Sequence, residues 1–259
     1  MSDTSRIDAI ICAAAQAWAH DGEVLATGIG VVPRLAASLA KLSCNPDLMM
    51  TDSEAWLVKE PVPIGPRTGP LQGYRVRRES HMGFARIFDN VWSGKRHAMV
   101  GPTQIDAFGQ ANISMIGADH RQPKAQMLGV RGFPGNSMNH ANSFFVPQHS
   151  TKVFVSGEVD MVCSAGYNPA RLARGWSLDE IDIRMVVTNL CVMDFGGPGH
   201  QMRLRSLHEG VSAQQVQEAT GFPIHVPADV STTAAPTAHQ LELLARLDPH
   251  GLRAAVLGG

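Results

Sequence analysis

The segment with the most chemical options for its length lies at residues 127–145, with the sequence MLGVRGFPGNSMNHANSFF. Glycine lacks a Cβ, so the backbone at Gly129, Gly132 and Gly135 can adopt conformations that other residues avoid, and it can approach a ligand closely. Backbone N–H groups in such turns are the parts of an oxyanion hole, a set of donors that stabilises a developing negative charge on oxygen. The segment also carries four polar side chains suited to binding or proton transfer: Arg131, Asn136, Asn139 and His140.

Arg131 and His140 are suited to specific chemical roles. Arg131 can pair with a carboxylate or a phosphate through its planar fork of N–H donors. His140 can act as a general acid or base, whereas a histidine without an obvious partner is more often structural. A serine nucleophile at Ser137 or Ser143 is disfavoured, because the chain has no GxSxG turn. The segment therefore indicates either a donor-rich ligand site or a polar surface loop.

A second candidate site is the sequence TDSEAWL at 51–57, which follows a predicted strand. Ligands of open α/β sheets bind beyond the carboxyl ends of the strands, and Asp52 and Glu54 stand at such an end. A carboxylate there can act as a nucleophile or a base. The same residues also fit the start of a helix, with Asp52 or Ser53 as the N-cap. The residues alone leave both interpretations open.

The sequence TGIG at 27–30 offers a third possibility. Gly28 and Gly30 end a strand and precede a helix, where free N–H groups favour a bound phosphate. The dinucleotide-binding fingerprint needs a third glycine where this chain has Pro33, so a Rossmann NAD site is disfavoured. A ligand role and a simple tight turn between strand and helix both remain open.

These candidates must be positioned by an alternation of strands and helices. Apolar periodicity, capping residues and turn residues predict helices at 3–20, 33–44, 81–95, 212–221 and 238–247, and strands at 23–30, 47–52, 153–155, 185–190 and 191–195. Residues 96–106 are predicted to be a strand that runs into a turn at 106–112. The turn at 196–199 predicts a hairpin, with His200 and His208 on the surface. Such alternation predicts an α/β protein with an open, largely parallel sheet. We expect one domain over 1–259, with an irregular proline- and glycine-rich loop at about 59–80.

Composition excludes several classes of function. The formal net charge is −1, and no run of Lys or Arg stands out, so we expect neither a nucleic-acid partner nor an anionic membrane partner. No segment approaches the roughly 20 apolar residues of a membrane span, and the first helix lacks the features of a signal peptide. The four cysteines have no zinc-binding spacing and suggest buried reduced thiols. A cytoplasmic protein without a metal site is the expectation.

Three motifs in order resemble the β-subunits of the class I CoA-transferase family. DGEVLATGIGVVPRLAASL at 21–39 is similar to the family's opening strand, glycine turn and helix. VGPTQIDAFGQANIS at 100–114 resembles its GAxQVDxxGNxN segment. VVTNLCVMDF at 186–195, followed by LHEGVSAQQVQEATGFP at 207–223, resembles its carboxyl-terminal signature. The resemblance implies an open α/β sheet with helices on both faces, and an active enzyme that pairs an α-subunit with a β-subunit.

The departures from the family pattern are informative. Transferase β-subunits carry CoA as a thioester on the glutamate of a Ser-Glu-Asn-Gly motif. Here Ser53 and Glu54 match its first two residues, but Ala55 and Trp56 replace Asn-Gly. A shift by one residue would place Ser53 at the catalytic position. The transferases also have a simple glycine turn where this chain has the elaborate segment at 127–145, which resembles the IpdB-like clade of the family.

Members of that clade are β-subunits of a bacterial steroid ring-opening hydrolase, and the resemblance implies their chemistry. The substrate is a cyclic β-keto CoA thioester, opened by retro-Claisen carbon–carbon cleavage, and the catalytic base is a glutamate of the α-subunit. On this basis Arg131 and Asn136 are expected to face the acyl group, with Gly132 and Gly135 allowing its close approach and Asn139 and His140 nearby. CoA is then part of the substrate, no cofactor is permanently bound, and the assembly is expected to be an α2β2 heterotetramer.

Three alternatives accompany this expectation. A true CoA transferase would use Glu54 as its nucleophile. Sensor domains of sugar regulators share the fold, but this chain has no attached helix-turn-helix or basic region. A subunit that only shapes the pocket of its partner is compatible with the hydrolase hypothesis.

Overall fold

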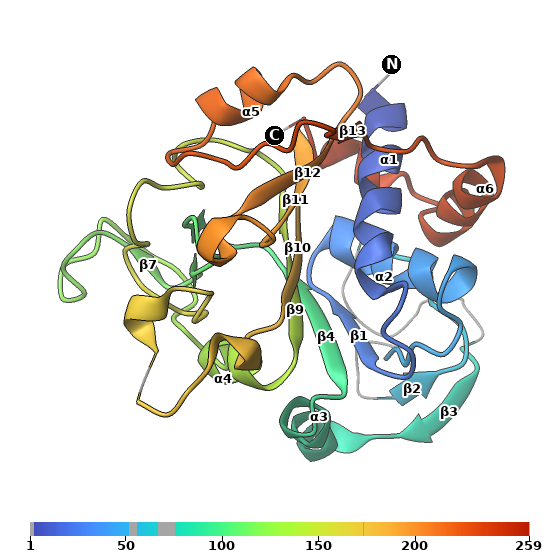
Figure 1. Cartoon of the computed structure of the whole chain (residues 1–259). Helices are drawn as coiled ribbons and strands as arrows, with labels where there is room; N and C mark the ends of the chain where they lie inside the picture. The colour runs from blue at the N-terminus through green and yellow to red at the C-terminus, as the bar shows by residue number, and fades with distance from the viewer. Residues whose placement is uncertain (1–2, 52–55, 67–75, 173, 259) are drawn as a thin grey trace. The chain divides into compact units, whose positions relative to one another are not determined.

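The computed structural model describes residues 3–51, 56–66, 76–172 and 174–258 of the chain, which Figure 1 colours by residue number. The Cα atoms group into two units: unit 1 comprises residues 1–100 and 234–259, and unit 2 comprises residues 101–233. The expectation of one domain over 1–259 stays a prediction. Of the expected loop at 59–80, residues 67–75 lie outside the described residues.

Unit 1 combines a short parallel sheet with helices that pack against it. Its elements are α1 (Asp3–Ala15), the 3-10 helix η1 (Gln16–Trp18), β1 (Leu25–Gly28), α2 (Val31–Ser43), β2 (Trp56–Val58), β3 (Arg78–His81), α3 (Gly83–Trp92), β4 (Arg96–Val100), α6 (Ala238–Leu247) and the 3-10 helix η5 (Leu252–Ala255). Strands β1 and β4 pair in parallel, α2 packs against β1, and α1 packs against α2. The predicted first strand and the helix after it are therefore present.

The turn between β1 and α2 explains the glycines of TGIG. A Cβ on Gly28 would lie 2.3 Å from the carbonyl carbon of Pro33, so only glycine lets the strand run directly into the helix. Gly30 has φ 103° at the N-cap of α2, a conformation that favours glycine. The tight-turn interpretation thus accounts for both residues. The strand expected at 47–52 is reduced to bridges at Met49 and Thr51, and Asp52 lies outside the described residues.

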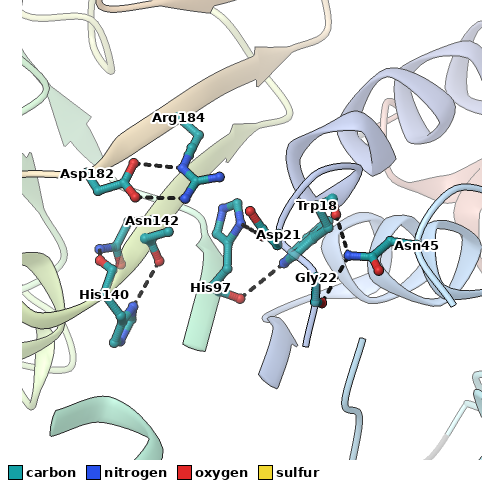
Figure 2. Close-up of polar contacts among 10 residues, drawn as sticks. Trp18, Asp21, Gly22, Asn45, His97, His140, Asn142, Asp182 and Arg184 are labelled. Atoms are coloured by element: carbon teal, nitrogen blue, oxygen red, sulfur yellow. Dashed lines mark hydrogen bonds and ion pairs between the residues drawn. The ribbon is translucent and has the colours of Figure 1, made fainter. Parts of the chain in front are cut away.

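Buried polar contacts fix the end of the first helical segment in unit 1 (Figure 2). The Asn45 side-chain amide donates to the carbonyl oxygens of Trp18, at 2.8 Å, and Gly22, at 3.2 Å. The Trp18 indole N–H donates to the carbonyl oxygen of His97. His97 Nδ1 lies 2.6 Å from Asp21 Oδ2, and both side chains are almost completely buried. Because these contacts join residues distant in sequence, they set where β1 can begin relative to β4.

A buried charged cluster attaches the carboxyl-terminal segment to α1. The Arg253 guanidinium donates from Nε to Asp8 Oδ1 at 2.6 Å and from Nη1 to Asp248 Oδ2 at 3.0 Å. The three side chains are only 12%, 7% and 0% exposed, in the order Arg253, Asp8, Asp248. Asp248 also accepts the backbone N–H groups of Leu252 and Arg253.

Five strands that share one sheet form the centre of unit 2. Its elements are β5 (Gln104–Ile105), β6 (Ala111–Asn112), β7 (Met115–Ile116), β8 (Ala125–Gln126), α4 (Phe133–Asn139), β9 (Ala141–Val146), η2 (Pro169–Arg171), η3 (Leu178–Glu180), β10 (Ile183–Thr188), β11 (Cys191–Asp194), η4 (Pro198–His200), β12 (Arg203–Leu207), α5 (Ala213–Glu218) and β13 (Ser231–Thr232). The strand order is β9-β10-β11-β12-β13. The β9–β10 and β12–β13 pairs are parallel, and β11 is antiparallel to both of its neighbours. The α/β class with a largely parallel sheet is confirmed, as is the hairpin between β11 and β12.

One predicted strand of unit 2 is wrong. Residues 153–155 form a turn, in which the N–H groups of Val153 and Phe154 both donate to the carbonyl oxygen of Ser150. A single bridge joins Phe154 to Ile105. Phe154 is completely buried, so the apolar residues at 153–155 pack one side chain from a turn into the core. A short alternation of apolar residues does not distinguish such a turn from a buried strand.

Buried histidines connect the end of β10 to the segment that follows α5. His149 Nδ1 lies 3.1 Å from Thr188 Oγ1, and its Nε2 lies 2.9 Å from Thr220 Oγ1. The imidazole of His149 stacks on Phe154, with ring centroids 3.9 Å apart. His208 Nε2 donates to the carbonyl oxygen of Thr188 at 2.9 Å. His208 is only 2% exposed, so the expectation of a surface residue is wrong; exposed His200 fits it.

No helix in the described part of the chain is long and apolar enough to span a bilayer.

The charged cluster around Arg253 predicts a large loss of stability on its removal. Arg253→Met should lower the free energy of unfolding by about 3–5 kcal/mol, because two buried carboxylates lose their counter-charge. Urea unfolding followed by tryptophan fluorescence measures the effect. Arg246→Met, at an exposed position of α6, is the matched control and should change stability little. Equal stability of the two variants would contradict the role of Arg253.

His149 predicts a loss of stability in mild acid. Burial lowers the pKa of His149 to about 4 from 6.5. Between these values the unfolded chain binds a proton that the folded chain does not, so stability is complete above pH 6.5 and is lost as the pH falls toward 4. Relative to His149→Gln, the wild-type protein should lose on the order of 3 kcal/mol over this window.

Thermal unfolding of both proteins between pH 4 and 8 tests this prediction. His239→Gln, at an exposed position of α6, should follow the wild-type curve. Parallel curves for the wild-type protein and His149→Gln would show that His149 does not titrate in this window.

Candidate functional site

The segment at 100–114 forms the β5–β6 hairpin, and a buried carboxylate holds its turn. Asp106 is 2% exposed, and its Oδ1 accepts the backbone N–H groups of Phe108 and Gln110 at 3.0 and 3.1 Å. The Gln110 side chain donates from Nε2 to Asp106 Oδ2 and to Glu158 Oε1, both at 2.9 Å. Burial raises the pKa of Asp106 to about 6. The hydrogen bonds oppose this rise because they favour the charged form.

The strands of this hairpin are joined by a second set of side-chain contacts. Asn112 Nδ2 donates to Gln104 Oε1 and to the carbonyl oxygen of Met115, both at 2.7 Å. Gln104 Nε2 donates to Asp160 Oδ2 at 3.2 Å, and the same oxygen accepts the Gly117 N–H at 2.8 Å. The polar residues of this motif therefore hold the backbone, and Asp160 connects the hairpin to the next one, β7–β8.

The loop at 163–167 lies between the β5–β6 hairpin and α4 and contacts both. Gly166 packs so closely that an added Cβ would lie 2.4 Å from the Gln110 nitrogen. The Ser137 hydroxyl, completely buried in α4, donates to the Pro134 carbonyl oxygen at 2.8 Å and accepts the Ala165 N–H at 3.2 Å. Ser137 thus fixes the helix to the loop, and Gly166 fixes the loop to the hairpin.

The segment at 127–145 is not a loop throughout, which corrects the sequence interpretation. It contains the seven-residue helix α4 and then enters β9. Glycine and asparagine are weak helix formers, but Phe133 is buried and packs edge-on against Phe144, with ring centroids 6.2 Å apart. Tertiary packing therefore imposes a helix that local propensity does not predict.

Arg131 and Asn136 have side chains that remain available. Arg131 is exposed and has φ 50°, a left-handed conformation that non-glycine residues seldom adopt. Asn136 is half-buried, and its backbone carbonyl accepts from Asn142 Nδ2 at 3.1 Å. Within the described parts of the chain, neither the Arg131 nor the Asn136 side chain makes a hydrogen bond or an ion pair. Gly132, the N-cap of α4, is exposed beside them.

The other residues of the predicted site have different surroundings. Asn139 Nδ2 donates to the Gly135 carbonyl oxygen within α4 at 2.7 Å, so both residues serve the helix. His140 is 6% exposed, and its Nδ1 lies 2.8 Å from the Ala141 carbonyl oxygen; Figure 2 shows it beside Asn142. This burial agrees with a structural histidine. Glu54 lies outside the described residues.

Sequence reasoning missed the contacts that position this site. Glu158 binds Gln110 and the Arg171 guanidinium, and these hydrogen bonds, that of Arg171 foremost, lower the pKa of Glu158 to about 2. The QxDxxxQxN spacing at 104–112 was a visible signal, because polar side chains alternating along a short hairpin can bind one another. The left-handed backbone of Arg131 had no signal, since arginine gives no indication of φ.

The four cysteines and the other side chains that can bind metal ions bear on metal and thiol chemistry. No group of three or more His, Cys, Asp or Glu side chains in the described residues is arranged to hold a metal ion. Cys12, Cys163 and Cys191 are buried and Cys44 is half-buried, all as free thiols. Burial raises the pKa values of Cys12 and Cys191 to about 12, which makes them poor nucleophiles.

Comparison with known proteins places the chain in a family. No family model matches it. It is 37% identical over 264 residues to the cholesterol ring-cleaving hydrolase IpdB subunit of Rhodococcus jostii (strain RHA1), covering 98% of this chain and 96% of that protein. The crystal structure of Rhodococcus jostii RHA1 IpdAB matches with a TM-score of 0.87 at 38% identity, over 96% of each chain.

A transferase is a more distant relative. One subunit of the 3-oxoadipate CoA-transferase of Pseudomonas knackmussii (strain DSM 6978) is 30% identical over 237 residues, covering 88% of this chain and 87% of that protein. The signature hairpin, the glycine turn after β1 and the carboxyl-terminal motif are the parts of the fold that the family resemblance identified. The chain therefore belongs to the IpdB-like subunits of the class I CoA-transferase β-subunit family.

Proposed function

We propose that this chain is the β-subunit of a heteromeric hydrolase that opens the last ring of a steroid-derived cyclic β-keto CoA thioester. The identity to subunits named cholesterol ring-cleaving hydrolase is 37% across 98% of the chain, against 30% across 88% for the transferase subunit. The segment at 127–145 supports the same choice, because it offers an arginine and an amide where a transferase needs only a glycine turn.

The reaction consumes one water molecule. A base takes one proton from the water as the water oxygen bonds to the ring ketone carbon, giving an alkoxide. The bond between this carbon and the α-carbon of the thioester then breaks, and its electron pair forms the thioester enolate, while the former ketone becomes a carboxyl group. The base then returns its proton to the α-carbon, which completes the ring-opened CoA thioester. Negative charge thus appears first on the alkoxide and then on the enolate oxygen.

We assign to Arg131 the role of stabilising this negative charge. The main support is the left-handed backbone conformation of Arg131. A left-handed arginine costs free energy that a glycine would not. The guanidinium is exposed and has no ion pair among the described residues, so no contact within that part of the chain explains the strain. A positioned cation at a developing oxyanion can lower the barrier by about 3 kcal/mol.

The neighbouring groups have supporting roles. The Asn136 amide is a second donor beside Arg131, while Gly132 leaves the approach to α4 free of side chains. Gly135, Asn139 and His140 hold α4 and the start of β9 in place. Arg131 alternatively binds the substrate's carboxylate side chain, which uses the same guanidinium geometry.

The partner completes the site. We assign the catalytic base to a glutamate of the α-subunit, in an α2β2 assembly; the relative of known structure is itself a two-subunit protein, IpdAB. CoA enters as part of the substrate, and we assign no permanently bound cofactor. Free thiols fit the reducing cytoplasm, which is where we place the enzyme.

Arg131→Ala should lower ring opening about 100-fold, because about 3 kcal/mol of barrier stabilisation is lost. The measurement is the rate of ring opening by the co-purified α and β subunits. Arg174→Ala, at another exposed arginine of unit 2, should leave the rate unchanged. A near wild-type rate for Arg131→Ala would remove Arg131 from the mechanism.

The hydrolase and transferase hypotheses differ in the fate of Glu54. A transferase forms a glutamyl-CoA thioester, which borohydride or hydroxylamine converts into a stable modification. We expect the complex incubated with acyl-CoA and either reagent to show an unmodified Glu54 by peptide mass spectrometry. A modified Glu54 would establish the transferase mechanism.

A further inference from the structure

The β7–β8 hairpin, residues 115–126, forms an arm with a firmly attached base. Met115 pairs with Gln126 and Ile116 with Ala125, and the Lys124 N–H donates to the Ile116 carbonyl oxygen at 2.7 Å. The Gly117 N–H donates to Asp160, the carboxylate that also binds the β5–β6 hairpin. In Figure 1 the arm, in green, extends away from strands β9 to β12. The base is fixed, and residues 118–122 at the tip are exposed.

The arm as a whole carries more positive than negative side chains. Arg121 and Lys124 are exposed, and the one acidic residue of the arm is Asp119. Asp119 Oδ1 accepts the backbone N–H of Arg121 at 2.9 Å, so that carboxylate serves the turn. Within the described residues neither Arg121 nor Lys124 forms an ion pair, whereas Arg171 and Arg203 of the same unit are bound by carboxylates.

The arm leads directly to the proposed acyl site. After β8 the Met127 N–H donates to the Ser114 carbonyl oxygen, which keeps the returning strand in place, and Arg131 follows four residues later. An extended chain rises about 3.3 Å per residue, so the ten residues from Arg121 to Arg131 span at most roughly 33 Å. The segment therefore carries cations near both of its ends, with the exposed apolar side chains of Leu128 and Val130 between them.

A CoA thioester has a matching distribution of charge. Its phosphate groups lie at one end, the reacting acyl group lies at the other, and an uncharged pantetheine arm separates them. We propose that Arg121 and Lys124 bind the phosphates of CoA while Arg131 faces the acyl end of the same molecule. This inference rests on the proposed function, and it specifies which end of the ligand each part of the chain receives. Two cations on a rigid hairpin also raise the local concentration of a polyanionic substrate.

The test uses the co-purified α–β complex with a double substitution, Arg121→Gln/Lys124→Gln. Calorimetric titration with free CoA should show a Kd raised roughly tenfold or more, since two charge-assisted contacts are lost. Titration with dephospho-CoA should show a smaller change, and titration with pantetheine none. In kinetics the loss should appear in KM for the CoA thioester, and the Kd of the variant should depend less on salt than that of the wild-type complex.

Lys152→Gln/Arg174→Gln is the matched control, because it removes the same charge from exposed positions elsewhere in unit 2; it should bind CoA like the wild-type complex. An unchanged Kd for CoA in the arm variant would overturn the inference. Equal losses for CoA and pantetheine would also overturn it, since the damage would then not concern phosphate. Binding of free CoA does not require ring opening, so failure of the proposed function and failure of this inference give different results.

Discussion

The buried carboxylate of Asp106 is the constraint on which unit 2 depends. It accepts two backbone N–H groups and the Gln110 amide, and so it forces residues 104–112 into one compact hairpin. The loop that contains Gly166 fits against this hairpin, and Ser137 of α4 is bound to that loop. A charged group buried at this depth is costly unless its oxygens are occupied. The geometry of the candidate site therefore follows from satisfying one carboxylate.

The same hairpin also serves the second part of the ligand. Asp160 joins Gln104 to Gly117, which ties the base of the β7–β8 arm to the network around Asp106. In the mechanism we propose, the acyl group and the phosphates of one CoA thioester meet surfaces carried by a single anchored segment. Rigid positioning of both ends is what converts binding energy into orientation at the reacting carbon. The side chains between the two ends then need only allow the pantetheine arm to pass.

Local signals predicted much of this fold. Helices at 212–221 and 238–247 were predicted from local residues, and the structure has α5 and α6 there, with capping boxes at Ser212 and Thr237. Helix α2 was predicted because Pro33 and the glycine turn lie at its start in the sequence. Prediction failed where distant contacts decide the outcome. Packing of Phe133 creates α4 from poor helix formers, and the burial of His208 depends on partners elsewhere in unit 2. For the candidate site, the sequence indicated Arg131 and its neighbours. Only the structure distinguishes the Arg131 and Asn136 side chains, which bind no described residue, from that of Asn139, which binds within the helix.

Because Arg131 has a left-handed backbone, selection for stability and selection for a guanidinium favour different residues at this position. Glycine would occupy φ 50° without the cost of roughly 1 kcal/mol or more that a side chain incurs there. A search for thermostable variants would consequently favour glycine at this position, and the gain in melting temperature would come with the loss of the guanidinium. In the mechanism we propose, residue 131 is thus a position where stability and chemistry cannot be improved together, and stabilising designs for this chain should leave it unchanged.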